Sequence, residues 1–540
     1  MGDDMSLMGS LYVGQSGLQT GQNALNTTAH NMSNVDTVGY TRQQVQQTAR
    51  TYRTLSKTNS ANAYQQAGLG VQYARVKQVR DYFLDKTYRR ESGRSAFYDT
   101  TYDAVGEIEN LFQELEGEAF ADAIKNLWES VQEIAKDPSN TVNQGVFIQR
   151  CNEFTTRAAA VYDGLCEYQD NMNYTVQQKV NQMNKYGARI AELNQQILRI
   201  EAAQVEKAND LRDERNQLTD ELSKLAHINL KEDIDGNFII SVEGTEFVKE
   251  DGINEIALLQ DENTGFYTPY WKHFAKTDAA GKLDISRAKV FNLDMEISTD
   301  MNTDIGGLKA TLIARGDHRA TYKDLENKDV YDKSIAPSVV MNIQAEFDQL
   351  INKVSTRINE VIKNAADDAQ KKVPGTQYLR DPNSNPPYSD VLKIFVTKSG
   401  NEMTVSNLMV GDTIKQSPSL LGFIKDDRKV DQETADELKN IFTQADYTLN
   451  PNVKTKTTFR DYYNNLISQV SNTGNVLKGI SENQQQTVDS TLAAREQIVG
   501  VSADEEMSNM IMFQNAFNAS SRYINVVSEM LEHILTTLGR

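Results

Sequence analysis

Histidine and cysteine, two side chains that could bind a metal ion or act as a nucleophile, are few and widely separated in this sequence. The five histidines are unpaired and stand at His30, His227, His273, His318 and His533. No His-Glu-x-x-His zinc pattern, phosphate-binding Gly-x-x-x-x-Gly-Lys loop or Gly-x-Ser-x-Gly nucleophile elbow is present. The two cysteines, Cys151 and Cys166, fit no zinc spacing and are too few for a disulfide framework. We therefore expect both thiols to be buried as small apolar groups.

One acidic segment, Asp233-Ile234-Asp235-Gly236, has the composition of the start of a calcium-binding loop. The later ligand positions do not follow at the required spacing, and Phe238 to Val242 alternates like a strand, so a hairpin turn is the better interpretation. An enzyme inserted between Lys231 and Arg315 would need a metal or nucleophile cluster, which that segment does not display. We expect no catalytic residue, no metal and no cofactor.

The composition excludes several classes of partner. The chain has 540 residues, with 56 Lys plus Arg against 75 Asp plus Glu, and a formal net charge of −19. Nucleic acid and anionic membrane surfaces bind clustered cations, so neither is expected as a partner. The first residues are acidic and no long apolar run follows them, so we expect neither a cleaved secretion signal nor a transmembrane helix.

The C-terminal segment has the heptad pattern of a coiled-coil helix. Apolar residues recur every seven positions at Met510, Phe517, Ile524, Leu531 and Leu538. A second series lies three residues after each of the first four, at Phe513, Ser520, Val527 and Ile534. Ser502 and Glu505 are spaced as a capping box, which predicts that the helix begins there. Because its apolar stripe needs cover, we expect this helix to pack against another helix.

The N-terminal segment has the same seven-residue period, at Leu11, Leu18, Leu25 and Met32, but it is weakened by glycines. Those glycines are Gly9, Gly14, Gly17 and Gly21, and each lowers helix stability by roughly 0.8–1.0 kcal/mol relative to alanine. We expect this segment to become helical only when its narrow, glycine-lined face packs against a partner, and to be disordered in the free monomer. An ordinary helix pair between the two ends of one chain fits the same periodicity.

Two segments are similar to a known family. Residues 24–43 read ALNTTAHNMSNVDTVGYTRQ and resemble the N-terminal signature of flagellar rod, hook and hook-associated proteins. Residues 504–522 read DEEMSNMIMFQNAFNASSR and resemble the matching C-terminal motif. The ending Gly39-Tyr40-Thr41-Arg42-Gln43 resembles that of the FlgK family of hook-associated proteins. Val38 stands where many relatives have proline, and His30 replaces a residue that is often Asn or Ser.

This resemblance implies a structural, non-enzymatic role at the hook–filament junction of the bacterial flagellum, outside the cell. It implies type III export with a chaperone on the C-terminal helix, and polymerisation as a short ring on the hook tip, between the hook protein and the second junction protein. We expect the assembly contacts at Leu11, Leu18, Leu25 and Met32 against Phe513, Phe517, Ile524, Val527, Leu531 and Ile534. The alternatives are another axial protein (the second junction protein, flagellin or hook protein) or a cytosolic coiled-coil scaffold.

The remaining pattern predicts a mainly α, multidomain chain with nested domains. Apolar spacing is helical from about Tyr82 to Leu230, alternates like strands after Leu230, and becomes helical again from Val340. We assign a terminal coiled coil to 1–50 and 500–540, a long-helix bundle to 51–230, 335–368 and 455–499, a β-rich insertion to 231–334 and a second outer insertion to 369–454. In the second insertion we expect strands near 394–396 and 403–405.

Overall fold

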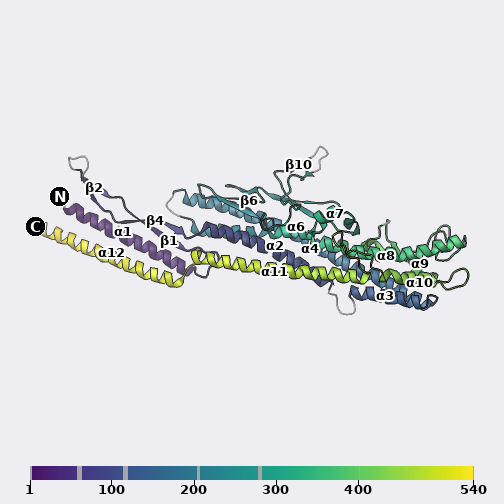
Figure 1. Cartoon of the computed structure of the whole chain (residues 1–540). Coiled ribbons are helices and arrows are strands. Elements are labelled where there is room, and N and C mark those ends of the chain that lie inside the picture. Colours follow the sequence, from purple (N-terminus) through teal and green to yellow (C-terminus); the bar gives the residue numbers. More distant parts are fainter. Residues whose placement is uncertain are drawn as a thin grey trace. The chain divides into compact units, whose positions relative to one another are not determined.

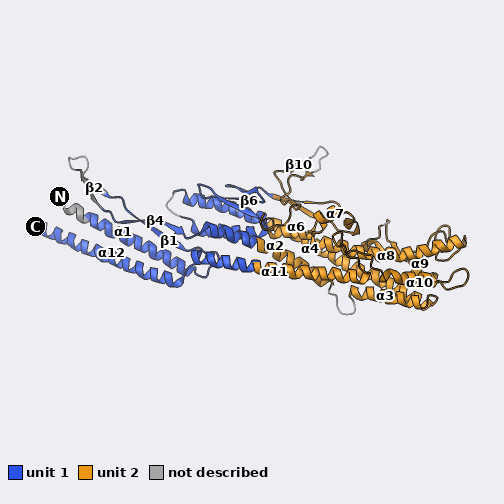
Figure 2. Cartoon of the chain, viewed as in Figure 1, with its two compact units in different colours: residues 1–93, 182–255, 484–540 blue, residues 94–181, 256–483 orange. Residues whose placement is uncertain are grey.

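The computed structural model describes residues 3–57, 64–112, 119–203, 207–277, 283–400 and 402–538. These residues form two compact units, coloured separately in Figure 2. Unit 1 contains residues 1–93, 182–255 and 484–540, and unit 2 contains residues 94–181 and 256–483. The fold is mainly α, with small antiparallel sheets between the long helices. This confirms the predicted fold class. The two units are a coarser division than the four predicted domains, which stay a prediction.

The two ends of the chain form a helix pair in unit 1. Helix α1 (Asp3–Ser33) lies beside helix α12 (Ala503–Leu538), and the two termini lie at the same end of this pair, so the helices run antiparallel (Figure 1). Between Leu7 and Ser33, α1 contains no Lys, Arg, Asp or Glu. Helix α12 begins where the sequence predicts, because the Glu505 amide donates to the Ser502 hydroxyl at 3.4 Å.

Residues 43–57 and 64–78 form two strand pairs, whereas the sequence pattern assigned them to the terminal coiled coil and the helical bundle. Strand β1 (Gln43–Ala49) pairs with β4 (Val71–Gln78), and β2 (Arg53–Lys57) pairs with β3 (Tyr64–Ala67). Val45 is the only large apolar residue of β1, so the usual alternation of apolar and polar residues is missing. Strands β1 and β4 both contact α1.

The rest of unit 1 packs helices against a three-stranded sheet. The elements are the first part of α2 (Tyr82–Phe112), the end of α4 (Thr141–Glu201), α5 (Asn209–Leu225), β5 (Ile228–Glu232), β6 (Phe238–Val242), β7 (Thr245–Val248) and the end of α11 (Phe459–Val499). Strands β6 and β7 occur where the alternation predicts them. The turn between them has positive φ at Glu243 (49°) and Gly244 (81°), as a tight hairpin requires.

Unit 2 is built around one large apolar core. Its helices include α3 (Phe120–Lys136), α8 (Val339–Lys372), α10 (Gln432–Thr443) and parts of α2, α4 and α11. At the centre of the core, the ring of Phe120 lies 5.0 Å from that of Phe347 and 5.2 Å from that of Tyr463. These residues come from α3, α8 and α11, so the core joins segments that are distant in sequence.

The smaller elements of unit 2 differ in part from the expectation. They are β8 (Ile256–Gln260), β9 (Tyr267–Trp271), β10 (Lys276–Thr277), β11 (Leu283–Asp284), α6 (Gly307–Arg315), η1 (Tyr322–Leu325), α7 (Lys328–Val330), η2 (Tyr331–Ile335), β12 (Phe395–Thr397), η3 (Val405–Asn407), β13 (Leu408–Val410), α9 (Asp412–Gln416) and η4 (Pro418–Leu421). Among the described residues of 231–334, no strand follows Asp284. The strand expected near 403–405 is wrong, since Val405–Asn407 forms a 3-10 turn and the partner of β12 begins at Leu408.

Candidate assembly interface

The closest approach of the terminal helices is made by glycines of α1. A Cβ atom placed on Gly14 would lie 2.6 Å from Ile524 Cγ1, and one on Gly17 would lie 2.7 Å from Ser520 Oγ. A Cβ on Gly21 would lie 3.4 Å from the backbone of Phe517. Real Cβ atoms do not approach other atoms within 3.0 Å, so a side chain at Gly14 would displace Ile524, and one at Gly17 would displace the Ser520 hydroxyl. The glycine-lined face predicted from the sequence therefore packs on α12.

The ten predicted contact residues lie on these two helices. Val527 is buried, and the other nine are half-buried, at Leu11, Leu18, Leu25, Met32, Phe513, Phe517, Ile524, Leu531 and Ile534. The antiparallel register places Ile524 at Gly14 and Phe517 at Gly21. The structure thus brings α1 and α12 together within one chain, while the role of these ten residues between chains stays a prediction.

A buried asparagine holds the end of α1 in place. The Asn31 amide donates to the Gln43 carbonyl at 2.8 Å and to Glu506 Oε2 at 3.2 Å. Its Oδ1 accepts from the Tyr40 hydroxyl at 2.8 Å and from the Gln43 amide at 3.0 Å. Asn31 thus uses both of its polar atoms, and it links α1 to β1 and to α12.

Arg42 joins the same cluster to the start of α12. Its Nε donates to Glu506 Oε1 and its Nη1 to Glu505 Oε2, both at 2.8 Å. Glu506 is 1% exposed, so its charge is compensated by Arg42 and by the Asn31 amide. The Glu505 carboxylate accepts from Arg42 instead of reaching back to Ser502 as the capping box predicts. We refer to Asn31, Arg42 and Glu506 as the terminal knot.

Thr41 anchors the adjacent loop on α5. Its amide and hydroxyl donate to Asp213 at 3.1 and 2.5 Å, and the Gln78 side chain donates to the same carboxylate at 2.8 Å. Burial raises the pKa of Asp213 to about 6, while the Thr41 hydrogen bonds and nearby Arg80 oppose that shift. Burial and the carboxylates of Asp213, Asp210 and Glu506 also raise the pKa of Tyr40, which therefore stays a neutral donor.

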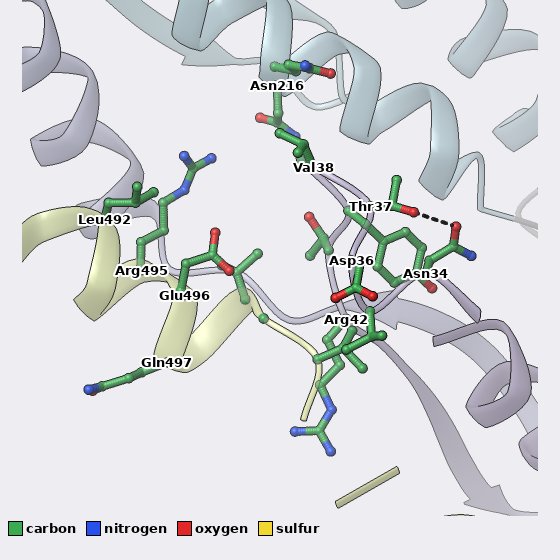
Figure 3. A pocket seen from close by; sticks show the side chains of 18 of the residues that line it. Asn34, Asp36, Thr37, Val38, Arg42, Asn216, Leu492, Arg495, Glu496 and Gln497 are labelled. Atoms are coloured by element: carbon green, nitrogen blue, oxygen red, sulfur yellow. Dashed lines mark hydrogen bonds between the residues drawn. The ribbon is translucent and has the colours of Figure 1, made fainter. Parts of the chain in front are cut away.

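A cavity of about 690 Å³ lies beside this cluster, lined by the Asn34–Arg42 loop, α5, the end of α11 and residues 500–505. Figure 3 shows Arg495 and Glu496 extending from α11; Val38 of the loop and Asn216 of α5 also line the cavity. Arg495 binds Asp85 and Asp220, each at 2.8 Å, so its charge is already compensated. Among the described residues, no three His, Cys, Asp or Glu side chains are grouped to hold a metal ion. The cluster can therefore hold segments together, and we assign it no chemistry.

A second, exposed apolar face of α12 lies beside the face that packs on α1. Met512, Tyr523, Val526 and Met530 are all more than 40% exposed and follow one another at 11, 3 and 4 residues, close to whole helical turns. We call these four residues the outer stripe. Met507, Ile511 and Leu535 are further exposed apolar residues of the same helix. An apolar surface of this kind is typical of a contact with another protein.

The knot residues were not predicted as site residues, although all three lie in the two motifs quoted above. One signal was available: Arg42 is the first Lys or Arg of the chain, and Asp504-Glu505-Glu506 is the acidic run that opens the last helix. Opposite charges beside two helices expected to pair indicate an ion pair between them.

Comparison with known proteins decides the family. A family model described as "Flagellar hook-associated protein FlgK helical domain" matches residues 105–376, just over half of the chain. The chain belongs to the FlgK family. FlgK membership confirms the resemblance read from the two terminal motifs. Residues 11–41 and 497–537 also match models described as "Flagella basal body rod protein" and "Flagellar basal body rod FlgEFG protein C-terminal".

FlgK relatives from Bacillus and Salmonella are similar to this chain over almost their whole length. "Flagellar hook-associated protein 1" of Bacillus subtilis (strain 168) is 25% identical over 526 residues, which cover 97% of this chain and 96% of that protein. The protein of the same name from Salmonella typhimurium is 23% identical over 96% of this chain and 98% of its own length. The flagellar hook junction protein FlgK from Burkholderia pseudomallei aligns with a TM-score of 0.40 and 16% identity, over 58% of this chain and 46% of that chain.

Proposed function

We propose that this FlgK-family chain is a structural subunit of the bacterial flagellum at the hook–filament junction, where it polymerises on the hook tip and allows the filament to assemble. Family membership supports the place in the flagellum. The observation that carries the assembly role is the antiparallel α1–α12 pair, which keeps the outer stripe exposed.

A second copy of the chain is the occupant that best fits the outer stripe. The chain as a whole has a net charge of −19, which would make its copies repel one another. The terminal pair is poor in charge where copies would meet, because from Met507 to Leu538 the charged side chains are only Arg522, Glu529 and Glu532, with His533. Contact between the stripe and a different surface of the next copy would propagate around a ring.

The exposed apolar residues of α12 also suggest how the chain meets the hook protein, the second junction protein and an export chaperone. We propose that the hook protein and the second junction protein contact the assembled ring on its two sides. Before export, the exposed apolar residues of α12 need cover in the cytosol, and an export chaperone on this helix would supply it. The final location would be extracellular. Among the helices that the structure describes, none combines the length and apolar composition needed to cross a bilayer.

Helix α1 by itself is a poor helix former, so we propose that the terminal pair is disordered in the free monomer and forms during assembly. Three glycines within eight residues, Gly14, Gly17 and Gly21, each weaken the isolated helix by roughly 0.8–1.0 kcal/mol. Packing against α12 and against neighbouring copies would compensate this loss.

The direct test is binding to hook–basal bodies isolated from a strain that lacks this chain, measured by cosedimentation. Val526→Glu places a charge in the outer stripe and should reduce binding at least tenfold, because burying an unpaired carboxylate is costly. Val476→Glu is the matched control, because it makes the same substitution at an exposed valine outside the stripe. Val476 lies on α11 and is 63% exposed, compared with 46% for Val526. If both variants bind like the natural chain, the stripe is not an assembly contact and the proposal fails.

A further inference from the structure

Two methionines occupy the same line of the outer stripe. Met512 and Met530 are 55% and 52% exposed, respectively. They are 18 residues apart, which is five full turns of an α-helix, so their side chains leave α12 in the same direction. Tyr523 and Val526 lie between them on this face. Both thioethers are therefore open to solvent in the free chain, and both belong to an apolar surface.

We propose that Met512 and Met530 form an oxidation-sensitive site, at which a peroxide converts the outer stripe from an assembling into a non-assembling surface. This inference rests on the proposed function, because it requires the stripe to be covered in the assembled chain. Beyond the proposed function, it assigns a covalent modification, methionine oxidation, and the class of reagent that causes it, a peroxide.

The chemistry needs only the methionine and the peroxide. The thioether sulfur donates an electron pair to one oxygen of the peroxide, an S–O bond forms, and the O–O bond breaks. The sulfur is oxidised by two electrons, the peroxide is reduced, and with hydrogen peroxide the leaving group becomes water. The product is methionine sulfoxide, which is polar and wider than the thioether, so it disrupts an apolar contact.

Burial separates these two sulfurs from others in the chain. Met172, Met183 and Met341 are buried in the fold, so peroxide should leave them intact. Met295 and Met301 are exposed in unit 2, outside the terminal pair, and they should oxidise as readily as the stripe residues. They are internal controls, because their oxidation should not affect binding to hooks.

The experiment treats the purified full chain with hydrogen peroxide, locates the added oxygens by peptide mass spectrometry, and measures cosedimentation with hook–basal bodies. We expect Met512 and Met530 to gain oxygen and binding to fall at least tenfold. The double variant Met512→Leu with Met530→Leu keeps the apolar stripe and should bind like the natural chain before and after peroxide. The control Met295→Leu with Met301→Leu should remain peroxide-sensitive.

Three results would overturn the inference. Oxidation of both stripe residues without loss of binding would show that the sulfoxides are tolerated. Loss of binding in the peroxide-treated Met512→Leu, Met530→Leu variant would place the sensitive sulfur elsewhere, for example at Met507 or Met8. Absence of binding by the untreated natural chain would overturn both this inference and the proposed function, whereas the first two results leave the proposed function intact.

Discussion

Replacing Gly14 by leucine should reduce binding to hook–basal bodies by roughly 5- to 150-fold, which corresponds to the 1–3 kcal/mol typical of overpacking. A Cβ at this position would lie 2.6 Å from Ile524 Cγ1 and 3.1 Å from Tyr523 Cδ1, so leucine displaces these two side chains or moves α1 away from α12. Leucine favours an isolated helix by nearly 1 kcal/mol relative to glycine. A loss of binding would therefore come from helix pairing and not from weaker helix formation.

Gly9→Leu is the matched control for this substitution. It changes a glycine of the same helix to the same residue, and a Cβ on Gly9 would have nothing within 4 Å. We expect this variant to bind like the natural chain. Equal binding by Gly14→Leu and Gly9→Leu would show that the glycine face does not pack on α12 in the assembled protein.

Replacing Glu506 by glutamine should destabilise the assembled chain by roughly 2–3 kcal/mol, measured as the urea midpoint for release from hooks. The buried Glu506 carboxylate accepts from Arg42 Nε and from the Asn31 amide. Glutamine presents an NH₂ group to one of these donors, and it leaves the Arg42 charge less compensated. This loss of stability is smaller than the largest values known for buried ion pairs. Arg42 still binds Glu505 in the variant, and the Arg42 side chain is 25% exposed.

Glu505→Gln is the comparison that isolates burial. Glu505 binds the same arginine at the same distance, 2.8 Å, but its side chain is 63% exposed. Exposed pairs contribute about 0–1 kcal/mol, so this variant should differ little from the natural chain. A Glu505→Gln effect as large as that of Glu506→Gln would contradict the assignment of Glu506 to a buried knot.

Periodic apolar patterns carried most of the fold prediction. The heptads of Leu11 and Phe517 each predict a helix in the right place, and the alternation of Phe238 to Val242 predicts β6. Prediction failed where the period is absent. In β1 the segment Gln43-Gln44-Val45-Gln46-Gln47 has one apolar side chain. Its pairing with β4 depends on backbone hydrogen bonds, which any residue type can make and which the sequence therefore does not indicate.

The candidate site could be predicted only in part, for a related reason. Leucine heptads and glycines are local signals, so the two faces that meet were visible in the sequence. The terminal knot joins Arg42 to Glu506 across 464 residues, and neither residue belongs to a repeat. An ion pair of this kind depends on how two segments that are distant in sequence come together, and no local residue pattern records that.

The central claim is that α1 and α12 of the same chain pair antiparallel along the glycine face when the protein is assembled. The most direct measurement is a disulfide between Gly17→Cys and Ser520→Cys in chains bound to hook–basal bodies. A Cβ on Gly17 would lie 3.5 Å from Ser520 Cβ, within the range that disulfides require. The natural Cys151 and Cys166 are buried, so they should not compete.

The control pair is Gly17→Cys with Ser528→Cys, which moves the second thiol eight residues, or about 12 Å, along α12. The account predicts that the first pair forms a disulfide within each chain, seen as a monomer-sized band that shifts on reduction, and that the control pair forms none. Disulfides that link different chains, or no disulfide in the Gly17→Cys, Ser520→Cys protein, would contradict it.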